Sequence, residues 1–415
     1  MLSRRDFVKG GVALVSIGTA GTSLLKGAVA FAAQDRAGVD ASKQGNILIL
    51  VQLAGGNDGL ATLVPIGDSA YRSARPTLAP ADETLLPLEQ GYGLTPELKG
   101  LKGLWDEKRL AIVRGVGYPQ QDYSHFRSMA IWEHGDPSLA LDNGWLGRTL
   151  DAMESEQHDP FFGFNVGGST PPEMRGETFS VPSVSDQSDY GFKVGGREAP
   201  EGDARTATLL RLYEEYPANS PYGVLLETTA ETAVESSRAL AEVSAKYTAA
   251  VPYPETSFGA GLSLLAQTIT GGLGIRVGHV TLGGFDTHSN QPDDHGALMT
   301  TLDDGLTAFY RDLAAHDCSK NVLVMTWSEF GRRVAQNAND GTDHGASSIM
   351  FMLGDGVRGG LFGDAPSLTN LVDRGNLPYT TDFRSVYATV IERWLGTPSA
   401  PLLGQQWPLL GFVGG

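Results

Sequence analysis

The chain has 415 residues and a formal net charge of −17, so its surface repels nucleic acid phosphates, attracts divalent cations and excludes nucleic acid as an expected partner. Hydrophobic residues make up 41% and charged residues 19%, which is typical of a globular protein rather than a disordered one. A single cysteine, Cys318, excludes an internal disulfide, so the stability must come from a buried core.

The N-terminus carries an export pattern. Residues 3–9, SRRDFVK, precede a modest apolar stretch that ends in small residues around Ala28 to Ala32. This segment resembles a twin-arginine export signal, so we expect residues 1–33 to be a signal peptide and 34–45 a linker. Lys26 interrupts the apolar run, and a membrane-spanning helix needs about 20 apolar residues, so no permanent membrane anchor is expected. The expected partner is the twin-arginine export machinery, which exports folded proteins, and the expected location is periplasmic or extracellular.

Residues 46–415 are predicted to form a single α/β domain, in which a mainly parallel sheet is flanked by helices. Continuous apolar runs such as 46–53, NILILVQL, are typical of strands buried on both faces. The predicted strands are 46–53, 110–113, 276–282, 321–326 and 348–353. The predicted helices are 96–108, one beginning near 125, 295–315 and 382–395. Residues 200–255, rich in Ala, Glu, Leu and Thr, are predicted to be a mostly helical insertion.

Polar clusters lie beside four of these strands. Three follow a strand and one directly precedes a strand, and they are Asn57–Asp58, Asp286 with His288, Ser328–Glu329, and Asp343–His344. The carboxyl edge of a parallel sheet is where ligands bind, so these clusters predict a divalent metal site there. Each cluster also has an ordinary interpretation, since Asp58 can be a turn residue, the Asp343 pair a surface turn, and Asp294 with His295 a helix start.

A short loop between the second strand and its helix holds a further candidate. Asp122 or Ser124 can cap the helix that begins near His125, which places the Ser124 hydroxyl at the positive end of the helix dipole. His125 can equally be a satisfied polar group at the helix start.

The order of these pieces resembles the alkaline phosphatase and sulfatase superfamily. From Arg276 onward the chain has a strand, an Asp-x-His loop, a long helix, a strand ending in TWSEFGR, then TDHG, a further strand, and the final segment TTDFRSVYATVIERWLG. A closer resemblance is to the DUF1501 family of exported bacterial proteins. It rests on VQLAGGNDGLATLVP, YSHFRSMAIWEHG, GWLGRTLD, GGFDTH and TWSEFGRR with TDHG.

The superfamily resemblance implies an alkaline phosphatase-like fold and an exported metal-dependent hydrolase or transferase acting on phosphate or sulfate esters. It implies a divalent metal, with zinc, manganese, magnesium and calcium all open, and an ester substrate of unknown identity. The implied metal ligands are Asp58, Asp286, His288, Glu329 and His344, with Asp343 either as a further ligand or behind the ligands. The implied catalytic residues are Ser124 as nucleophile, His125, and Arg127, which would hold an oxyanion or instead form a surface ion pair.

The sequence also departs from the superfamily pattern. Ser328-Glu329-Phe330 stands where the superfamily has an Asp-His pair, the Asp-x-His spacing is short, and no Cys-x-Pro-x-Arg sulfatase signature is present. His125 or His295 could supply a missing donor. The alternative function is therefore a non-catalytic periplasmic binding or assembly protein on the same fold, with a vestigial or structural metal site. Motifs for a dinucleotide or haem are missing, so a redox enzyme is not favoured.

Overall fold

The computed structural model describes residues 45–153, 161–177, 181–185, 208, 211, 236–373 and 375–414. The predicted signal peptide, all but the last residue of the predicted linker, and most of the predicted insertion at 200–255 lie outside these residues and stay predictions. Within the insertion, residues 236–246 are helical. None of the described helices is both long and apolar enough to cross a membrane.

A nine-stranded sheet runs through the middle of the described residues, in the order β13-β5-β12-β9-β1-β8-β6-β7, with β14 also paired to β5. Its strands are β1 (Ile47–Ala54), β5 (Leu110–Gly117), β6 (Gly163–Val166), β7 (Ser183–Val184), β8 (Val277–Gly283), β9 (Val322–Trp327), β12 (Ser348–Leu353), β13 (Gly360–Phe362) and β14 (Thr381–Asp382). All neighbours pair in parallel except β12, which is antiparallel to both β5 and β9. The prediction of a mainly parallel sheet is confirmed.

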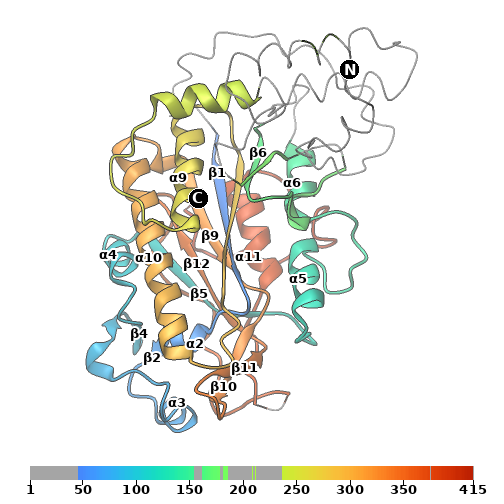
Figure 1. The fold of residues 1–415 in the computed structure, drawn as a ribbon. Helices are drawn as coiled ribbons and strands as arrows, with labels where there is room; N and C mark the ends of the chain where they lie inside the picture. Colours follow the sequence, from blue (N-terminus) through green and yellow to red (C-terminus); the bar gives the residue numbers. More distant parts are fainter. Residues whose placement is uncertain are drawn as a thin grey trace, which may run out of the picture.

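Helices cover both faces of this sheet (Figure 1). One face packs against α4 (Lys99–Asp106), α9 (Ser257–Thr270) and α10 (Gln291–Ala315). The other packs against α5 (His125–His134), α6 (Trp145–Met153) and α11 (Phe383–Thr389), which a π-helical turn extends to Trp394. The predicted helices are therefore present, although α10 begins at Gln291, before the predicted 295.

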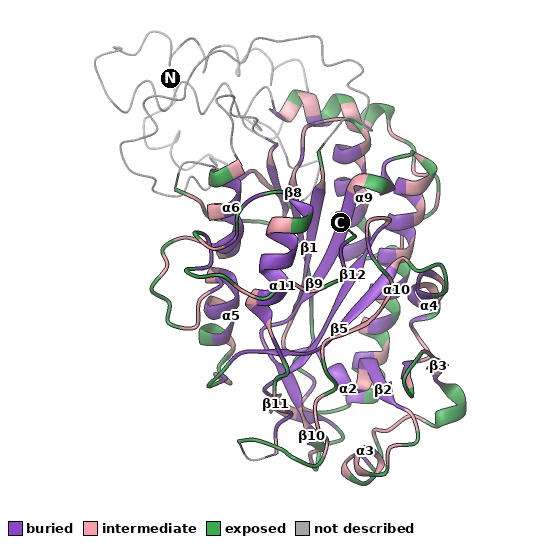
Figure 2. Ribbon diagram, turned by 180° about the vertical axis from the view of Figure 1, so that it is seen from behind, coloured by how far each residue is buried: buried purple, intermediate pink, exposed green. Residues whose placement is uncertain are grey.

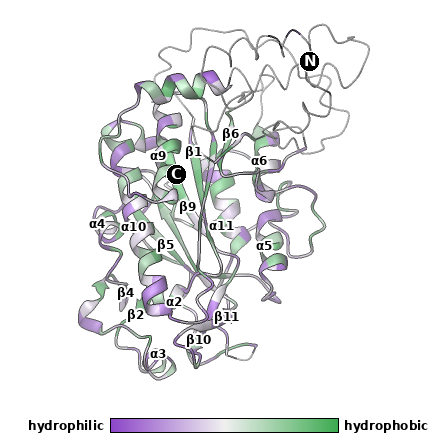
Figure 3. Ribbon diagram, viewed as in Figure 1, coloured by the Kyte–Doolittle hydropathy of each residue, from purple (hydrophilic) through white to green (hydrophobic). Residues whose placement is uncertain are grey.

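The central strands are buried on both faces because their side chains alternate between the two cores. In β1, Ile47, Ile49 and Val51 belong to one core, whereas Leu48 and Leu50 belong to the other. Figure 2 shows these strands as buried, and Figure 3 shows that they are also the hydrophobic part of the fold. This is the packing that the continuous apolar run at 46–53 predicts.

The site lies at one edge of the sheet, where β1, β5, β8 and β9 end. Because β12 is antiparallel to β5 and β9, it begins at this edge, and the hairpin β10 (Gly331–Gln336) with β11 (Thr342–Gly345) precedes it there. The short helices α2 (Gly59–Thr62) and α3 (Ser69–Ala74) and the small sheet of β2 (Leu63–Pro65), β4 (Tyr92–Leu94) and β3 (Leu86–Pro87) lie at the same end (Figure 1).

A glycine allows two of the strand-end loops to touch. Gly55 follows β1 with φ of +122°, and a Cβ atom on it would lie 2.5 Å from the backbone nitrogen of Asp286. A side chain at Gly55 is therefore excluded both by the backbone conformation and by the loop after β8.

Candidate metal centre

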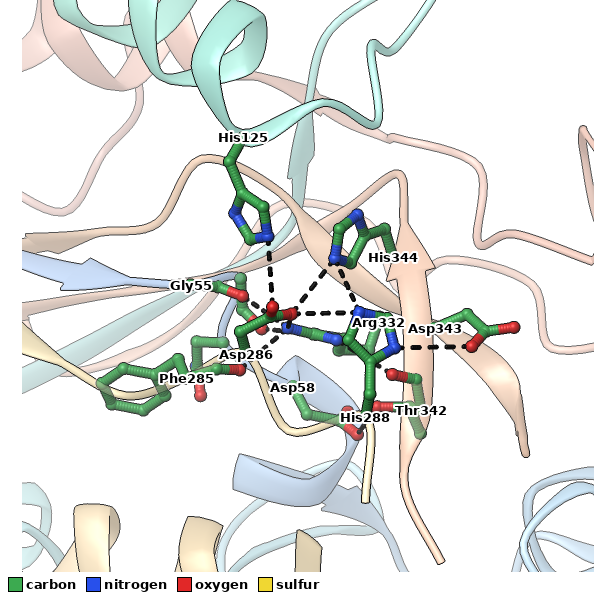
Figure 4. Close-up of polar contacts among 12 residues, drawn as sticks. Gly55, Asp58, His125, Phe285, Asp286, His288, Arg332, Thr342, Asp343 and His344 are labelled. Carbon is green, nitrogen blue, oxygen red and sulfur yellow. Dashed lines mark hydrogen bonds and ion pairs between the residues drawn. The ribbon is translucent and has the colours of Figure 1, made fainter. Parts of the chain in front are cut away.

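Three side chains from three separate segments converge at this edge. His125 begins α5, Asp286 follows β8 and His344 lies on β11, and one potential ligand atom from each lies within 4.8 Å of the others. His288 extends the group, because its Nε2 lies 2.9 Å from Nε2 of His344 and 3.1 Å from Oδ1 of Asp286 (Figure 4). We call His125, Asp286, His288 and His344 the histidine–aspartate cluster.

The tautomer of each histidine follows from the partner of its Nδ1 atom. Nδ1 faces the Tyr123 carbonyl oxygen in His344 (2.8 Å), Glu329 Oε1 in His125 (2.8 Å) and Asp343 Oδ1 in His288 (3.5 Å). These partners are acceptors, so a proton on Nδ1 of each ring satisfies them, and the Nε2 atom of each ring faces the cluster. Burial also lowers the pKa of His344, which keeps its ring neutral.

Nε2 of His288 lies 2.9 Å from Nε2 of His344, where one ring donates to the other or, with both protons on Nδ1, the two lone pairs face a shared cation. The same arrangement, with Nδ1–H bonded to a carbonyl or carboxylate and Nε2 left free, is typical of histidines that bind metals. Three imidazole nitrogens and one carboxylate therefore fit a divalent ion.

Arg332 holds the cluster's carboxylate in place. Its buried guanidinium donates to Asp286 Oδ1 at 2.8 Å and to the carbonyl oxygens of Phe285, Gly56 and Thr342 at 2.9, 2.8 and 2.9 Å. Burial raises the pKa of Asp286, but the hydrogen bond and the positive charge of Arg332 outweigh it and lower the pKa to about 2. Asp286 is thus a fixed anion.

Arg332 is not among the candidate residues that the sequence patterns indicate. Its one signal in the sequence is its place in the GRR that follows TWSEF, at the start of a segment with no strand pattern.

Glu329 and Asp343, which the resemblance implies as ligands, lie behind the histidines. The carboxylate of Glu329 is 1% exposed and accepts from the Gly55 backbone at 3.0 Å as well as from His125. Asp343 is half exposed and faces His288. In this arrangement Glu329 and Asp343 each orient an imidazole ring. Neither belongs to the group of three potential ligands formed by His125, Asp286 and His344.

Replacing Glu329 by glutamine is expected to weaken metal binding by about 10- to 100-fold, the usual loss when a carboxylate behind a histidine ligand is changed. Glutamine can still accept a hydrogen bond from His125 Nδ1. It removes the negative charge of Glu329, however, and that charge makes the His125 ring a stronger electron-pair donor to a metal. Competition with a chromogenic chelator would measure the affinity. Glu107→Gln, which changes an exposed ion pair with Arg311, is the control and should leave the affinity unchanged. Equal affinities for both variants would contradict this role.

Asp58 is held elsewhere. Its carboxylate caps α2 by accepting from the backbone nitrogens of Leu60 and Ala61, and it pairs with Arg75 at 2.7 Å. Gln291 donates to the same carboxylate at 2.6 Å. The structure does not bring Asp58 into the cluster, and Figure 4 shows its carboxylate apart from that of Asp286. These contacts favour the alternative in which Asp58 is a structural residue of the turn that starts α2.

Ser124 and Arg127 lie on the exposed start of α5. Ser124 occupies the N-cap position, but its side chain makes no capping hydrogen bond. It directly precedes His125, and the carbonyl of Tyr123 on its other side accepts from His344. Arg127 is 62% exposed and faces Asp122 at 3.3 Å, which is the surface ion pair anticipated as its alternative role.

His295 lies outside the cluster. It is buried within α10, where its Nε2 lies 3.1 Å from Asn57 Oδ1. Because that oxygen accepts, His295 donates from Nε2 and stays neutral, and burial lowers its pKa to about 4.

The buried His295 predicts a loss of stability in acid. Between about pH 6.5 and pH 4 the unfolded chain binds a proton at this ring and the folded chain does not, so the free energy of unfolding falls as the pH falls. The loss from this ring is roughly 2–3 kcal/mol. Urea unfolding of the wild type and His295→Gln at pH 7 and pH 4.5 measures it, since glutamine can donate the same hydrogen bond without titrating. Parallel pH dependence in the two proteins would contradict the prediction.

Comparison with known proteins identifies a family and distant structural likeness. The model of the family described as "Protein of unknown function (DUF1501)" matches residues 111–397. A search of curated proteins gave no match.

Among solved structures, the chain is similar to the PsFucS1 sulfatase from Pseudoalteromonas sp., with 11% identity, 87% of this chain and 68% of that chain covered, and a TM-score of 0.39. It is similar to the lipoteichoic acid synthase LtaP from Listeria monocytogenes, with 9% identity, coverage of 88% and 74%, and a TM-score of 0.37. A protein in the alkaline phosphatase superfamily from Vibrio parahaemolyticus gives 9% identity, coverage of 87% and 69%, and a TM-score of 0.34. At these values each is a distant likeness.

Proposed function

We propose that this chain, which belongs to the DUF1501 family, is a metal-dependent hydrolase or transferase acting on phosphate or sulfate esters. The observation that carries the proposal is the convergence of three imidazole Nε2 atoms on the Asp286 carboxylate at the ligand-binding edge of the sheet. Imidazole nitrogen is a poor ligand for magnesium and calcium, so we propose zinc or manganese as the ion.

The exposure of the cluster favours chemistry over a purely structural ion. The side chains of Asp286 and His288 are 47% and 43% exposed, so an ion held by them would stay open to a substrate, whereas structural sites are closed. A bound divalent ion would polarise the ester and lower the pKa of a hydroxyl beside it.

The residues of the chain suggest a division of roles. Ser124 is the proposed nucleophile because its exposed hydroxyl makes no capping bond and it adjoins His125. Arg332 and Glu329 hold Asp286 and His125 in place. Hydrolysis would consume one water, break the bond between the ester oxygen and phosphorus or sulfur, and release the alcohol with inorganic phosphate or sulfate. In a transferase, an acceptor hydroxyl takes the place of that water.

The sequence resemblance supports the same proposal, since the order of the motifs from Arg276 onward is that of a superfamily of phosphate and sulfate ester enzymes. The N-terminal pattern supports export of the folded protein by the twin-arginine route to the periplasm or beyond. A folded, metal-loaded protein is the form in which this route would deliver it.

The test combines metal content with turnover. The mature protein, exported by its own signal, is analysed for bound metal and assayed with phosphate and sulfate monoesters after loading with zinc, manganese, magnesium or calcium. We expect stoichiometric zinc or manganese, turnover of one ester class, and loss of turnover without loss of metal in Ser124→Ala. Stoichiometric metal with no turnover of either class would overturn the enzyme proposal in favour of a binding or assembly protein with a structural ion.

A further inference from the structure

A pocket of about 220 Å³ adjoins the histidine–aspartate cluster on the side of His288. Its wall is built by the β10–β11 hairpin, the end of α3 and the residues Leu368, Leu371 and Gly375. The wall contains polar residues, including Arg333, Asn337 and Asp343, and apolar residues, including Val334, Leu368 and Leu371.

One carboxylate separates the pocket from the cluster. Asp343 directs Oδ1 toward Nδ1 of His288 and Oδ2 toward Nη1 of Arg333, each at 3.5 Å. The side-chain amide of Asn337 donates to the carbonyl oxygen of His288 at 2.9 Å, so the pocket wall also holds the loop that carries this histidine. A molecule that fills the pocket would therefore lie beside anything bound at the cluster.

The guanidinium of Arg333 lines the pocket, and most of its N–H groups lack a close hydrogen-bond acceptor among the described residues. Arg332 and Arg333 are neighbours on β10, where successive side chains face opposite sides: Arg332 faces Asp286, and Arg333 lines the pocket. The Nε–H of Arg333 is buried and has no acceptor among the described residues, and its Asp343 contact is long.

An oxyanion would supply the hydrogen-bond acceptor that the Arg333 Nε–H lacks. A buried cationic N–H without an acceptor is costly, and two adjacent oxygens of a carboxylate, sulfate or phosphate match the edge of a guanidinium. The apolar residues of the wall favour an organic ligand over a free inorganic ion. Leu371 is 37% exposed and, with Leu368 and Val334, offers an apolar surface that carbon groups of a ligand can cover.

We infer that this pocket is a binding subsite for an oxyanion group on an organic body, held by Arg333. The link to catalysis rests on the proposed function: the ester transformed at the cluster then carries a second anionic group, and that group lies in the pocket. The preferred substrates are accordingly esters with two anionic groups rather than one.

Equilibrium binding of phenylphosphonate, which contains no ester bond, tests the subsite apart from catalysis. Titration calorimetry on the metal-free full chain compares the wild type with Arg333→Gln, and with Arg358→Gln as a control that removes an exposed arginine remote from the pocket. We expect Arg333→Gln to weaken binding by roughly tenfold or more, and Arg358→Gln to leave it unchanged. Leu371→Ala should weaken phenylphosphonate but not inorganic phosphate, which separates an organic ligand from a free ion.

Each outcome decides the inference. Binding that survives in an Asp286→Ala, His288→Ala double variant and weakens in Arg333→Gln places the ligand in the pocket. Equal binding by the wild type and Arg333→Gln, no binding by the wild type, loss in the double variant, or inorganic phosphate binding as tightly as phenylphosphonate would each overturn it. Failure of every ester to turn over would leave these binding results intact, so a failure of the proposed function is distinguishable from a failure of the subsite.

Discussion

Replacing His344 by alanine is expected to lower the affinity for zinc by about 100-fold or more and to remove ester turnover with it. His344 gives the cluster an imidazole whose proton is fixed on Nδ1 by the Tyr123 carbonyl, and whose Nε2 lies within 3.1 Å of both His288 and Asp286. Loss of a direct ligand should exceed the 10- to 100-fold effect of changing a carboxylate behind one.

Thermal unfolding gives an independent readout of the same variant. An ion at 100 times its dissociation constant stabilises the folded state by about 2.7 kcal/mol, so zinc should raise the unfolding temperature of the wild type but not of His344→Ala. His316→Ala is the matched control, because this partly exposed histidine contacts Asp312 at the end of α10, away from the cluster. A zinc shift of equal size in His344→Ala would exclude the cluster as the metal site.

Asp58→Asn is expected to destabilise the protein by about 3–5 kcal/mol, the cost of leaving a buried charge without its partner. Asp58 and Arg75 are 1% and 0% exposed and lie 2.7 Å apart. Burial raises the pKa of Asp58, but the charge and hydrogen bond of Arg75 outweigh it, so the net shift is downward and the carboxyl is ionised. The loss should be the same with and without metal, and the folded variant should bind metal like the wild type. Urea unfolding measures it.

The control for this variant is Asp68→Asn. Asp68 caps α3 by accepting from the Tyr71 backbone at 2.9 Å, and asparagine caps a helix as well as aspartate does. Asp68→Asn should therefore change stability little, which isolates the ion pair from the cap. Loss of metal from a stable Asp58→Asn protein would instead make Asp58 a ligand, as the family resemblance implies.

Much of the fold could be predicted because its core strands are continuous apolar runs, as strands buried in apolar cores on both faces must be. The segment 46–53 has no alternation to misread, and it forms β1 within one residue of its predicted bounds. The hairpin of β10 and β11 was not predicted, because neither strand is an apolar run: buried positions such as Arg332 and Thr342 are polar, and the one exposed position of β10 is Ala335. Hydropathy alone reads such a segment as a loop.

The sequence by itself determined that ligand-type side chains gather at strand ends, since Asp286, His288 and Glu329 each follow an apolar run that can only be a buried strand. It could not determine which of them meet. His344 precedes its strand, and it reaches the cluster only because β12 is antiparallel to its neighbours and so begins where they end. Whether a carboxylate faces the cluster, as in Asp286, or lies behind a histidine, as in Glu329, depends on distances of a few ångströms between segments far apart in the chain. Those distances are set by packing and by the Arg332 hydrogen bonds, and no residue spacing encodes them.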